Sequence, residues 1–201
     1  MIQQRRCKKV EKIAVIGNYM PRQCGIATFT TDISQALAKE LSNEENLINI
    51  AIDDIPQGHN YPSQVKFRIR ENVQEDYFWA ADYLNANQFE AAIVQHEFGI
   101  FGGEDGCFVL KLVKSLKMPV ITNLHTVLEN PSAGQRRVIE ELARYSDKFT
   151  VMNKRAIEIL TRVYGIDKKM IEFIPHGIPD GTFEEPGLAE CSEKELENER
   201  A

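Results

Sequence analysis

The sequence lacks several of the features that place a protein at once in a functional class. No apolar run approaches the roughly 20 residues that a membrane-spanning helix requires. The first 12 residues are polar and basic and do not resemble a secretory signal. The four cysteines, Cys7, Cys24, Cys107 and Cys191, are scattered, and no two of them have the spacing of a metal site or a redox motif. Together these absences favour a protein of the reducing cytoplasm.

Three familiar nucleotide and hydrolase motifs are also missing. The sequence contains no Gly-x-Gly-x-x-Gly dinucleotide fingerprint, no Gly-x-x-x-x-Gly-Lys-Ser/Thr phosphate loop and no Gly-x-Ser-x-Gly nucleophile elbow. No histidine pair has the spacing of a zinc site on a helix. We therefore expect no metal and no tightly held cofactor.

The acidic charge of the chain is concentrated near residue 201. The last 18 residues contain seven glutamates against one lysine and one arginine, which accounts for −5 of the net charge of −6. The rest is nearly neutral, so nucleic acid is not an expected partner. We predict three parts: a basic arm over residues 1–11 that could touch an anionic membrane surface, a domain over 12–180, and an acidic tail or truncated linker over 181–201.

Short apolar runs alternate with segments of helical periodicity. The runs predict strands over residues 12–17, 47–53, 65–69, 91–95, 120–124, 148–152 and 171–174. The helical segments carry start and stop signals at Asn72 with Glu75, Pro119, Ser132 with Gln135, and Gly165. This alternation predicts one Rossmann-like domain, a doubly wound and mostly parallel sheet of about seven strands with helices on both faces.

The carboxyl ends of these strands are the expected place for a site, because open parallel sheets bind ligands there. Gly25 lies in the loop between the first strand and a helical pattern that opens at Ala27. Free N–H groups and the dipole of that helix favour an anion, and the missing side chain of Gly25 lets backbone approach it. Polar residues that follow the strands are expected to face a crevice; they include Arg22, His96, Glu97, His125, Asn153 and His176.

Each residue also has a purely structural interpretation. Gly25 could be a plain turn glycine, His125 a hydrogen-bonded core histidine, and His96 part of a pair that closes a loop. Asp53 and Asp54 are adjacent acids at a strand end, which are usually solvated, so a change at Asp53 is expected to have little effect. The shared position of the other residues at one edge of the sheet favours a site over separate structural roles.

Four blocks of sequence resemble a branch of retaining glycosyltransferases. Residues 21–30 (PRQCGIATFT) look like its first-loop signature, and residues 95–103 (QHEFGIFGG) are similar to its second block. Residues 122–128 (TNLHTVL) and 174–180 (IPHGIPD) resemble two further blocks. The branch belongs to glycosyltransferase family 4, whose members have the two-domain GT-B architecture.

The resemblance implies transfer of a sugar from a nucleotide diphosphate sugar to an acceptor hydroxyl with retained configuration and without a bound metal. It places Gly25 by the donor diphosphate. It places His125 against the donor sugar, where a hydrogen bond from the imidazole would stabilise an oxocarbenium-like transition state. Plausible contacts to a sugar or lipid-linked acceptor are Arg22, His96, Glu97 and Phe98, and the cleft rim would include Asn153 and His176.

The family's second domain, with its Glu-x7-Glu motif and its cationic clamp on the diphosphate, has no counterpart in these 201 residues. We therefore expect the acceptor-side half of such an enzyme, nearly inactive without a donor-binding domain on the same or a separate chain. Its expected location is the cytoplasm or the inner face of the membrane. Two alternatives stay open: a stand-alone acceptor-binding subunit that recruits another chain, and a different doubly wound protein that binds a nucleotide or phosphate at Gly25.

Overall fold

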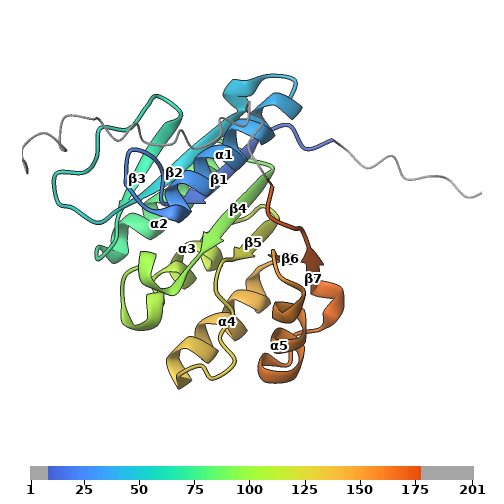
Figure 1. Ribbon diagram of the computed structural model, residues 1–201. Coiled ribbons are helices and arrows are strands. Elements are labelled where there is room, and N and C mark those ends of the chain that lie inside the picture. The colour runs from blue at the N-terminus through green and yellow to red at the C-terminus, as the bar shows by residue number, and fades with distance from the viewer. Residues whose placement is uncertain (1–8, 178–201) are drawn as a thin grey trace, which may run out of the picture.

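All seven predicted strands form, and each pairs in parallel with its neighbours in one sheet (Figure 1). The computed structural model describes residues 9–177, so the predictions for most of the basic arm, for residues 178–180 and for the acidic tail lie outside the described residues. The sheet order is β3-β2-β1-β4-β5-β6-β7. The strands are β1 Ile13–Gly17, β2 Leu47–Asp53, β3 Val65–Arg70, β4 Ala91–His96, β5 Val120–Leu124, β6 Lys148–Val151 and β7 Ile171–Phe173.

Five α-helices connect the strands over residues 9–177: α1 Gly25–Glu40, α2 Gln74–Ala86, α3 Val109–Ser115, α4 Ala133–Tyr145 and α5 Lys154–Tyr164. The connections from β1 to β2 and from β2 to β3 run one way along the sheet, and all later connections run the other way. Because parallel crossovers are right-handed, the two groups lie on opposite faces. The predicted doubly wound sheet is confirmed, with α1 on one face and α2 to α5 on the other.

The main core lies between the sheet and the helices α2 to α5, which cover one of its faces. Within that layer α2 packs on α3, α3 on α4 and α4 on α5. Alternate residues of β2 show the division of its side chains. Ile48, Ile50 and Ile52 belong to this core, while Asn49 points the other way and is hydrogen-bonded to Ser34 of α1. The face that carries α1 is therefore the more polar one.

Three of the four predicted helix signals are confirmed, since α3 ends at Ser115, ahead of Pro119, and two caps form, but the fourth is wrong. Ser132 and Gln135 form a reciprocal capping box at the start of α4, and Gly165 ends α5 with φ of +66°. The capping box predicted from Asn72 and Glu75 does not form, because α2 begins one residue later than that spacing requires and no side chain caps it.

The direction of winding reverses between β1 and β4, which are neighbours in the sheet. An open parallel sheet has its ligand crevice at this switch point, outside the carboxyl ends of the strands. The carboxyl ends of β1, β4 and β5 therefore define where a site can be built.

Candidate functional site

A hydrogen-bonded pair of side chains lies at the carboxyl ends of β4 and β5. The Nε2 atom of His125 is 2.9 Å from Oε1 of Gln95, and the same oxygen accepts a 2.8 Å hydrogen bond from Nδ2 of Asn123. The backbone N–H of His125 also donates to the carbonyl of His96 at 3.0 Å. Both the ring and the backbone of His125 are thus held by residues of β4.

Gln95 and Asn123 belong to a polar row that crosses the sheet on the face of α1. They are partners in the β4–β5 register, and Thr150 of β6 continues the row with a 2.9 Å hydrogen bond to Oδ1 of Asn123. Gly17 of β1 makes room for Gln95, because a Cβ at Gly17 would lie only 2.8 Å from the Cβ of Gln95. The sequence interpretation missed these positioning residues, although a glutamine and an asparagine inside apolar strands were a visible signal.

The imidazole of His125 is neutral over the physiological pH range. Its burial, and to a smaller extent the nearby His176, lowers the pKa of His125 from 6.5 to about 4. Because Oε1 of Gln95 can only accept a hydrogen bond, the proton of the neutral ring lies on Nε2. Within residues 9–177, Nδ1 of His125 has no hydrogen-bond partner, so its lone pair is available.

Helix α1 begins close to this histidine. The ring of Phe29 meets the His125 ring edge-on, with 5.0 Å between centroids, and meets the His176 ring in the same way at 5.3 Å. Gly25 lies one helical turn before Phe29, on the same side of α1. The first turn of α1 therefore lies on the same side of the crevice as His125.

The N-terminus of α1 has unused hydrogen-bond donors. The sulfur of Cys24 caps the helix by accepting from the N–H of Ala27 at 3.3 Å. Among the described residues, nothing accepts from the N–H groups of Gly25 and Ile26. A Cβ at Gly25 would meet no atom within 4 Å, so the fold itself does not require a glycine there.

A cavity of about 400 Å³ opens beside His125, and its lining includes the predicted rim residues Asn153 and His176. Leu128 and Ile159 contribute apolar side chains to its lining. Glu129 also lines the cavity and forms ion pairs with two arginines of α5. The structure thus brings His125, Asn153 and His176 to one cavity.

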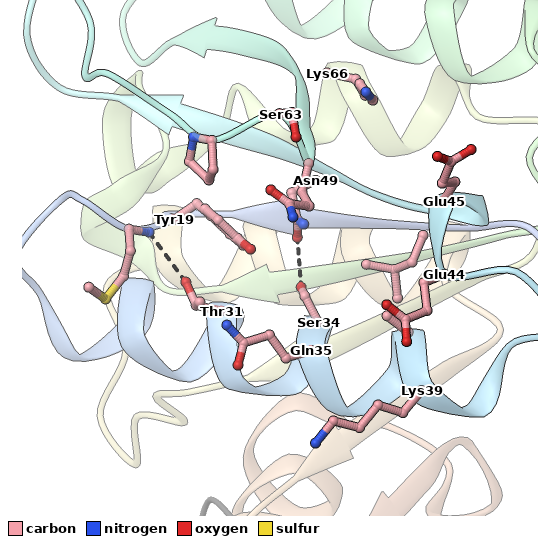
Figure 2. A pocket seen from close by; sticks show the side chains of 15 residues that line it. Tyr19, Thr31, Ser34, Gln35, Lys39, Glu44, Glu45, Asn49, Ser63 and Lys66 are labelled. Atoms are coloured by element: carbon pink, nitrogen blue, oxygen red, sulfur yellow. Dashed lines mark hydrogen bonds between the residues drawn. The ribbon is translucent and has the colours of Figure 1, made fainter.

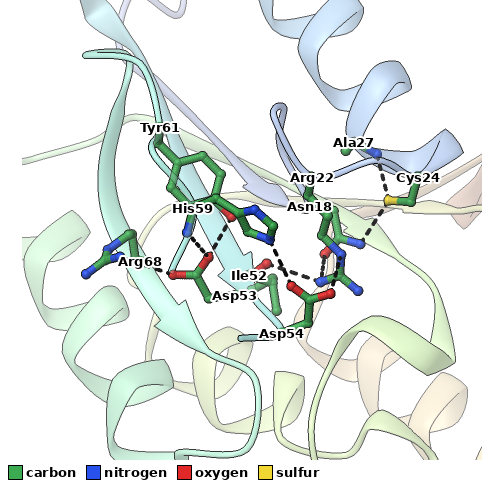
Figure 3. Close-up of polar contacts among 10 residues, drawn as sticks. All are labelled: Asn18, Arg22, Cys24, Ala27, Ile52, Asp53, Asp54, His59, Tyr61 and Arg68. Atoms are coloured by element: carbon green, nitrogen blue, oxygen red, sulfur yellow. Dashed lines mark hydrogen bonds and ion pairs between the residues drawn. The ribbon is translucent and has the colours of Figure 1, made fainter. Parts of the chain in front are cut away.

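Arg22 is not among the residues that line this cavity, and its side chain is turned toward the end of β2 (Figure 3). Its guanidinium donates to Oδ1 of Asn18 at 3.1 Å and to the carbonyl of Ile52 at 3.3 Å, and it pairs with Asp54 at 3.4 Å. Its side chain is 15% exposed, so it presents only an edge to solvent. Arg22 is therefore held as a fixed positive charge beside the first loop.

Glu97 fastens the loop after β4 to the loop after β5. One carboxylate oxygen accepts from the N–H of Phe98 at 3.0 Å, and the other accepts from the hydroxyl of Thr126. Because Thr126 follows His125, this bond fixes the backbone next to the histidine.

The expectation that His96 faces the crevice is wrong. Its side chain is 0% exposed, meets the Phe98 ring edge-on and stacks on Phe101. Burial lowers the pKa of His96 to about 3, and neither ring nitrogen has a hydrogen-bond partner among residues 9–177. Phe98 is also buried in the core, so neither residue can contact an acceptor in this arrangement.

The expectation that Asp53 is solvated is also wrong. Asp53 is 3% exposed and accepts a 2.7 Å hydrogen bond from the hydroxyl of Tyr61, while Arg68 pairs with it at 3.5 Å (Figure 3). Its neighbour Asp54 binds His59 at 2.9 Å. The two carboxylates anchor the β2–β3 connection through His59 and Tyr61, which sequence spacing does not reveal because both partners lie in that irregular segment.

No protein-family model and no curated protein matches the chain. Solved structures do. The chain is similar in structure to a glycosyltransferase from Rickettsia africae, with a TM-score of 0.56 and 14% sequence identity. The match covers 84% of this chain and 44% of that one, so the chain spans less than half of that glycosyltransferase. At this level of identity the likeness shows the fold, that of part of a glycosyltransferase.

Two further properties bear on the site and its surroundings. Across residues 9–177, no group of three or more histidine, cysteine, aspartate or glutamate side chains is arranged to hold a metal ion. Over the same residues, no helix combines the length and the apolar character that crossing a bilayer demands.

Proposed function

We propose that this chain is the acceptor-side half of a retaining glycosyltransferase of family 4, which moves a sugar from a nucleotide diphosphate sugar to an acceptor hydroxyl. The observation that carries the proposal is the neutral His125, held by Gln95 beside the open N-terminus of α1. The four sequence blocks and the likeness to part of a glycosyltransferase support it.

The N-terminus of α1 is the proposed contact for the donor diphosphate. The free N–H groups of Gly25 and Ile26 and the positive end of a 16-residue helix attract an anion. The open space at the Cβ position of Gly25 lets a phosphate oxygen approach the backbone. This contact would hold the leaving group as its bond to the sugar breaks.

His125 is the proposed contact for the donor sugar. Its N–H is committed to Gln95, so the imidazole would accept a hydrogen bond at Nδ1 from a sugar hydroxyl instead of donating one. As the electron pair of the glycosidic bond leaves on the diphosphate, the sugar becomes positively charged. A neutral ring with its lone pair toward that sugar stabilises the charge, whereas an imidazolium would repel it.

The acceptor, a sugar or a lipid-linked molecule, is proposed to enter between the first loop and the loop after β4. Arg22 supplies a fixed positive charge there, and Glu97 supports the loop that carries His125. The acceptor oxygen forms the new bond to the anomeric carbon and gives up its proton to an oxygen of the departing diphosphate, which gains negative charge as its bond to the sugar breaks. Asn153 and His176 line the rim on which the donor-binding domain would close.

The donor-binding domain is proposed to lie on the same or on a separate chain, so this chain alone should be nearly inactive. We would titrate the chain by calorimetry with nucleotide diphosphate sugars, dinucleotides and inorganic phosphate, and assay sugar transfer with and without a donor-binding domain. Weak binding of nucleotide diphosphate sugars, with transfer only when that domain is added, supports the proposal. Turnover at an ordinary enzyme rate by the chain alone, or tight dinucleotide binding, would refute it.

A further inference from the structure

A second cavity, of about 760 Å³, lies on the other flank of α1 (Figure 2). Phe29 faces His125, whereas Thr31, Gln35 and Ala38 face this cavity, as expected for positions roughly half a helical turn away from Phe29. The cavity is therefore separate from the proposed donor site. Its volume lies within the range of small-molecule sites, about 300–1,000 Å³.

The cavity exists because the β2–β3 connection contains no helix. Right-handed winding places that connection on the face of α1, but residues 54–64 cross it as an irregular segment. The sheet surface beside α1 is left open there, with Asn49 of β2 in its floor and Lys66 of β3 on its wall. Pro62, Ser63 and Gln64, from the irregular segment, also line the cavity.

Asn49 in the floor has an unmet hydrogen-bonding requirement. Its side chain is 1% exposed, and Oδ1 accepts a 2.7 Å hydrogen bond from the hydroxyl of Ser34. Its Nδ2 is buried and has no partner among the described residues. If the side-chain amide of Asn49 were rotated by half a turn, its nitrogen would bond to the hydroxyl of Ser34 and its oxygen would be left without a partner. One atom of the amide therefore lacks a partner in either orientation. A buried polar atom without a partner costs about 1–3 kcal/mol, so a ligand that pairs with it gains an advantage.

Most of the residues that line the cavity are neutral, and the amides and hydroxyls among them can both donate and accept hydrogen bonds. Amides and hydroxyls make up nearly half of the lining, and the phenol of Tyr19 is one of them (Figure 2). The charged residues of the lining balance in sign; they are Lys39, Lys66, Glu44 and Glu45. Balanced charge gives no preference for an anion or a cation.

We propose that this cavity is a binding site for a neutral saccharide, with the Asn49 amide hydrogen-bonded to a sugar hydroxyl or ring oxygen. A sugar hydroxyl donates and accepts at once, which matches amides and hydroxyls, and a buried orphan amide is best satisfied by such a group. The site does not depend on the function proposed above, because it shares no residue with the His125 cavity.

The test follows the side-chain amide resonances of Asn49 by ¹H–¹⁵N NMR while the chain is titrated with glucose, N-acetylglucosamine, maltose or inorganic phosphate. We expect a saturable shift with at least one saccharide and none with phosphate. Gln35→Ala, an exposed change in the wall, and Asn49→Leu, which removes the amide at similar volume, should each weaken the affinity at least tenfold, as judged from backbone resonances around the cavity. Asn72→Ala, an exposed change outside the lining, is the matched control and should leave the affinity unchanged.

Two results would overturn this assignment. One is that none of the three saccharides gives a saturable shift in a folded wild-type chain. The other is that phosphate shifts the Asn49 resonances at lower concentration than any saccharide. If Asn49→Leu does not fold, the Gln35→Ala variant still decides, because a saccharide affinity equal to that of the wild type would exclude this cavity as the site.

Discussion

Nε2 of His125 lies 2.9 Å from Oε1 of Gln95, and this contact decides which nitrogen of the imidazole carries the proton. The oxygen is fixed in place because Asn123 also donates to it at 2.8 Å. The lone pair of Nδ1 is therefore available for a ligand, and the catalytic proposal for His125 depends on this tautomer.

The first prediction concerns Gln95→Met in a protein that contains this chain and a donor-binding domain. Methionine has similar volume but offers no oxygen to the Nε2 proton, so the ring can adopt either tautomer. We expect kcat to fall about 10–100-fold, as for residues that orient a ligand through a hydrogen bond, with donor KM within about threefold. His125→Ala should lower kcat further. Steady-state kinetics measure both effects.

A control and a spectroscopic measurement separate positioning from a general loss of structure. Gln74→Met replaces a glutamine at the start of α2, on the opposite face of the sheet, and should leave kcat unchanged. The ¹⁵N shifts of the His125 ring should report a protonated Nε2 in the wild type and a mixture in Gln95→Met. An unchanged kcat in Gln95→Met would show that the tautomer plays no part in turnover.

The second prediction contrasts two glycines that the fold treats differently. Gly17→Ala forces a Cβ to 2.8 Å from Gln95, so we expect a loss of stability of about 1–3 kcal/mol in urea unfolding. Gly25→Ala places its Cβ in open space on a helix, so stability should hold or rise by up to about 1 kcal/mol. In a protein with a donor-binding domain, Gly25→Ala should nevertheless weaken donor binding, and Gly25→Val should weaken it more.

The stability measurement on Gly25→Ala is the control for its donor binding. A loss of donor binding in Gly25→Ala cannot be attributed to unfolding if the variant is as stable as the wild type. Wild-type donor affinity in Gly25→Val would show that no ligand approaches the backbone at this position.

Sequence patterns predicted the strands well because strands in a parallel sheet are buried on both faces. β2 illustrates this, since all seven of its residues are buried and the apolar run in the sequence ends at Ile52, one residue before the strand does. Helix boundaries followed side-chain signals only where those signals form contacts. Ser132 caps α4, whereas the β3–α2 corner is organised by Arg70, whose backbone and side chain both donate to Asp76.

The candidate site was only partly predictable, because strand ends place residues at the right edge without fixing the direction of their side chains. His96 ends β4 and His125 follows the neighbouring β5, yet the first ring is sealed in the core and the second borders a cavity. The difference arises from long-range packing, Phe98 and Phe101 against the first ring and Phe29 against the second. No local spacing encodes such contacts.

The third prediction is that Asp53→Ala destabilises the chain by about 1–3 kcal/mol, contrary to the expectation from sequence. The change leaves the hydroxyl of Tyr61 and the charge of Arg68 without their partner. Burial and the adjacent Asp53 raise the pKa of Tyr61, so the variant should also lower that pKa, which ultraviolet titration detects. Asp82→Ala, an exposed change on α2, is the control. Equal unfolding midpoints for the two variants would contradict the anchoring role.

The fourth prediction is that acid weakens the fold through buried histidines. Burial lowers the pKa of His96 from 6.5 to about 3 and that of His125 to about 4. Between pH 6.5 and these values the unfolded chain binds protons that the folded chain does not. The stability contributed by neutral burial is therefore complete above pH 6.5 and is lost as the pH falls. A single such histidine changes the free energy of unfolding by about 1.4 kcal/mol for each pH unit in that window.

His96→Leu isolates one of the two contributions, because His96 makes no hydrogen bond through its ring that the change could remove. At pH 7 the variant should be as stable as the wild type or more so, since two orphaned nitrogens are replaced by apolar atoms. Between pH 6.5 and 4.5 it should lose about 2–3 kcal/mol less than the wild type, measured by urea unfolding at each pH. If the free energies of unfolding of the two proteins fell in parallel with pH, the His96 ring would gain its proton as readily in the folded chain as in the unfolded one. That outcome would contradict the sealed position of the ring between Phe98 and Phe101.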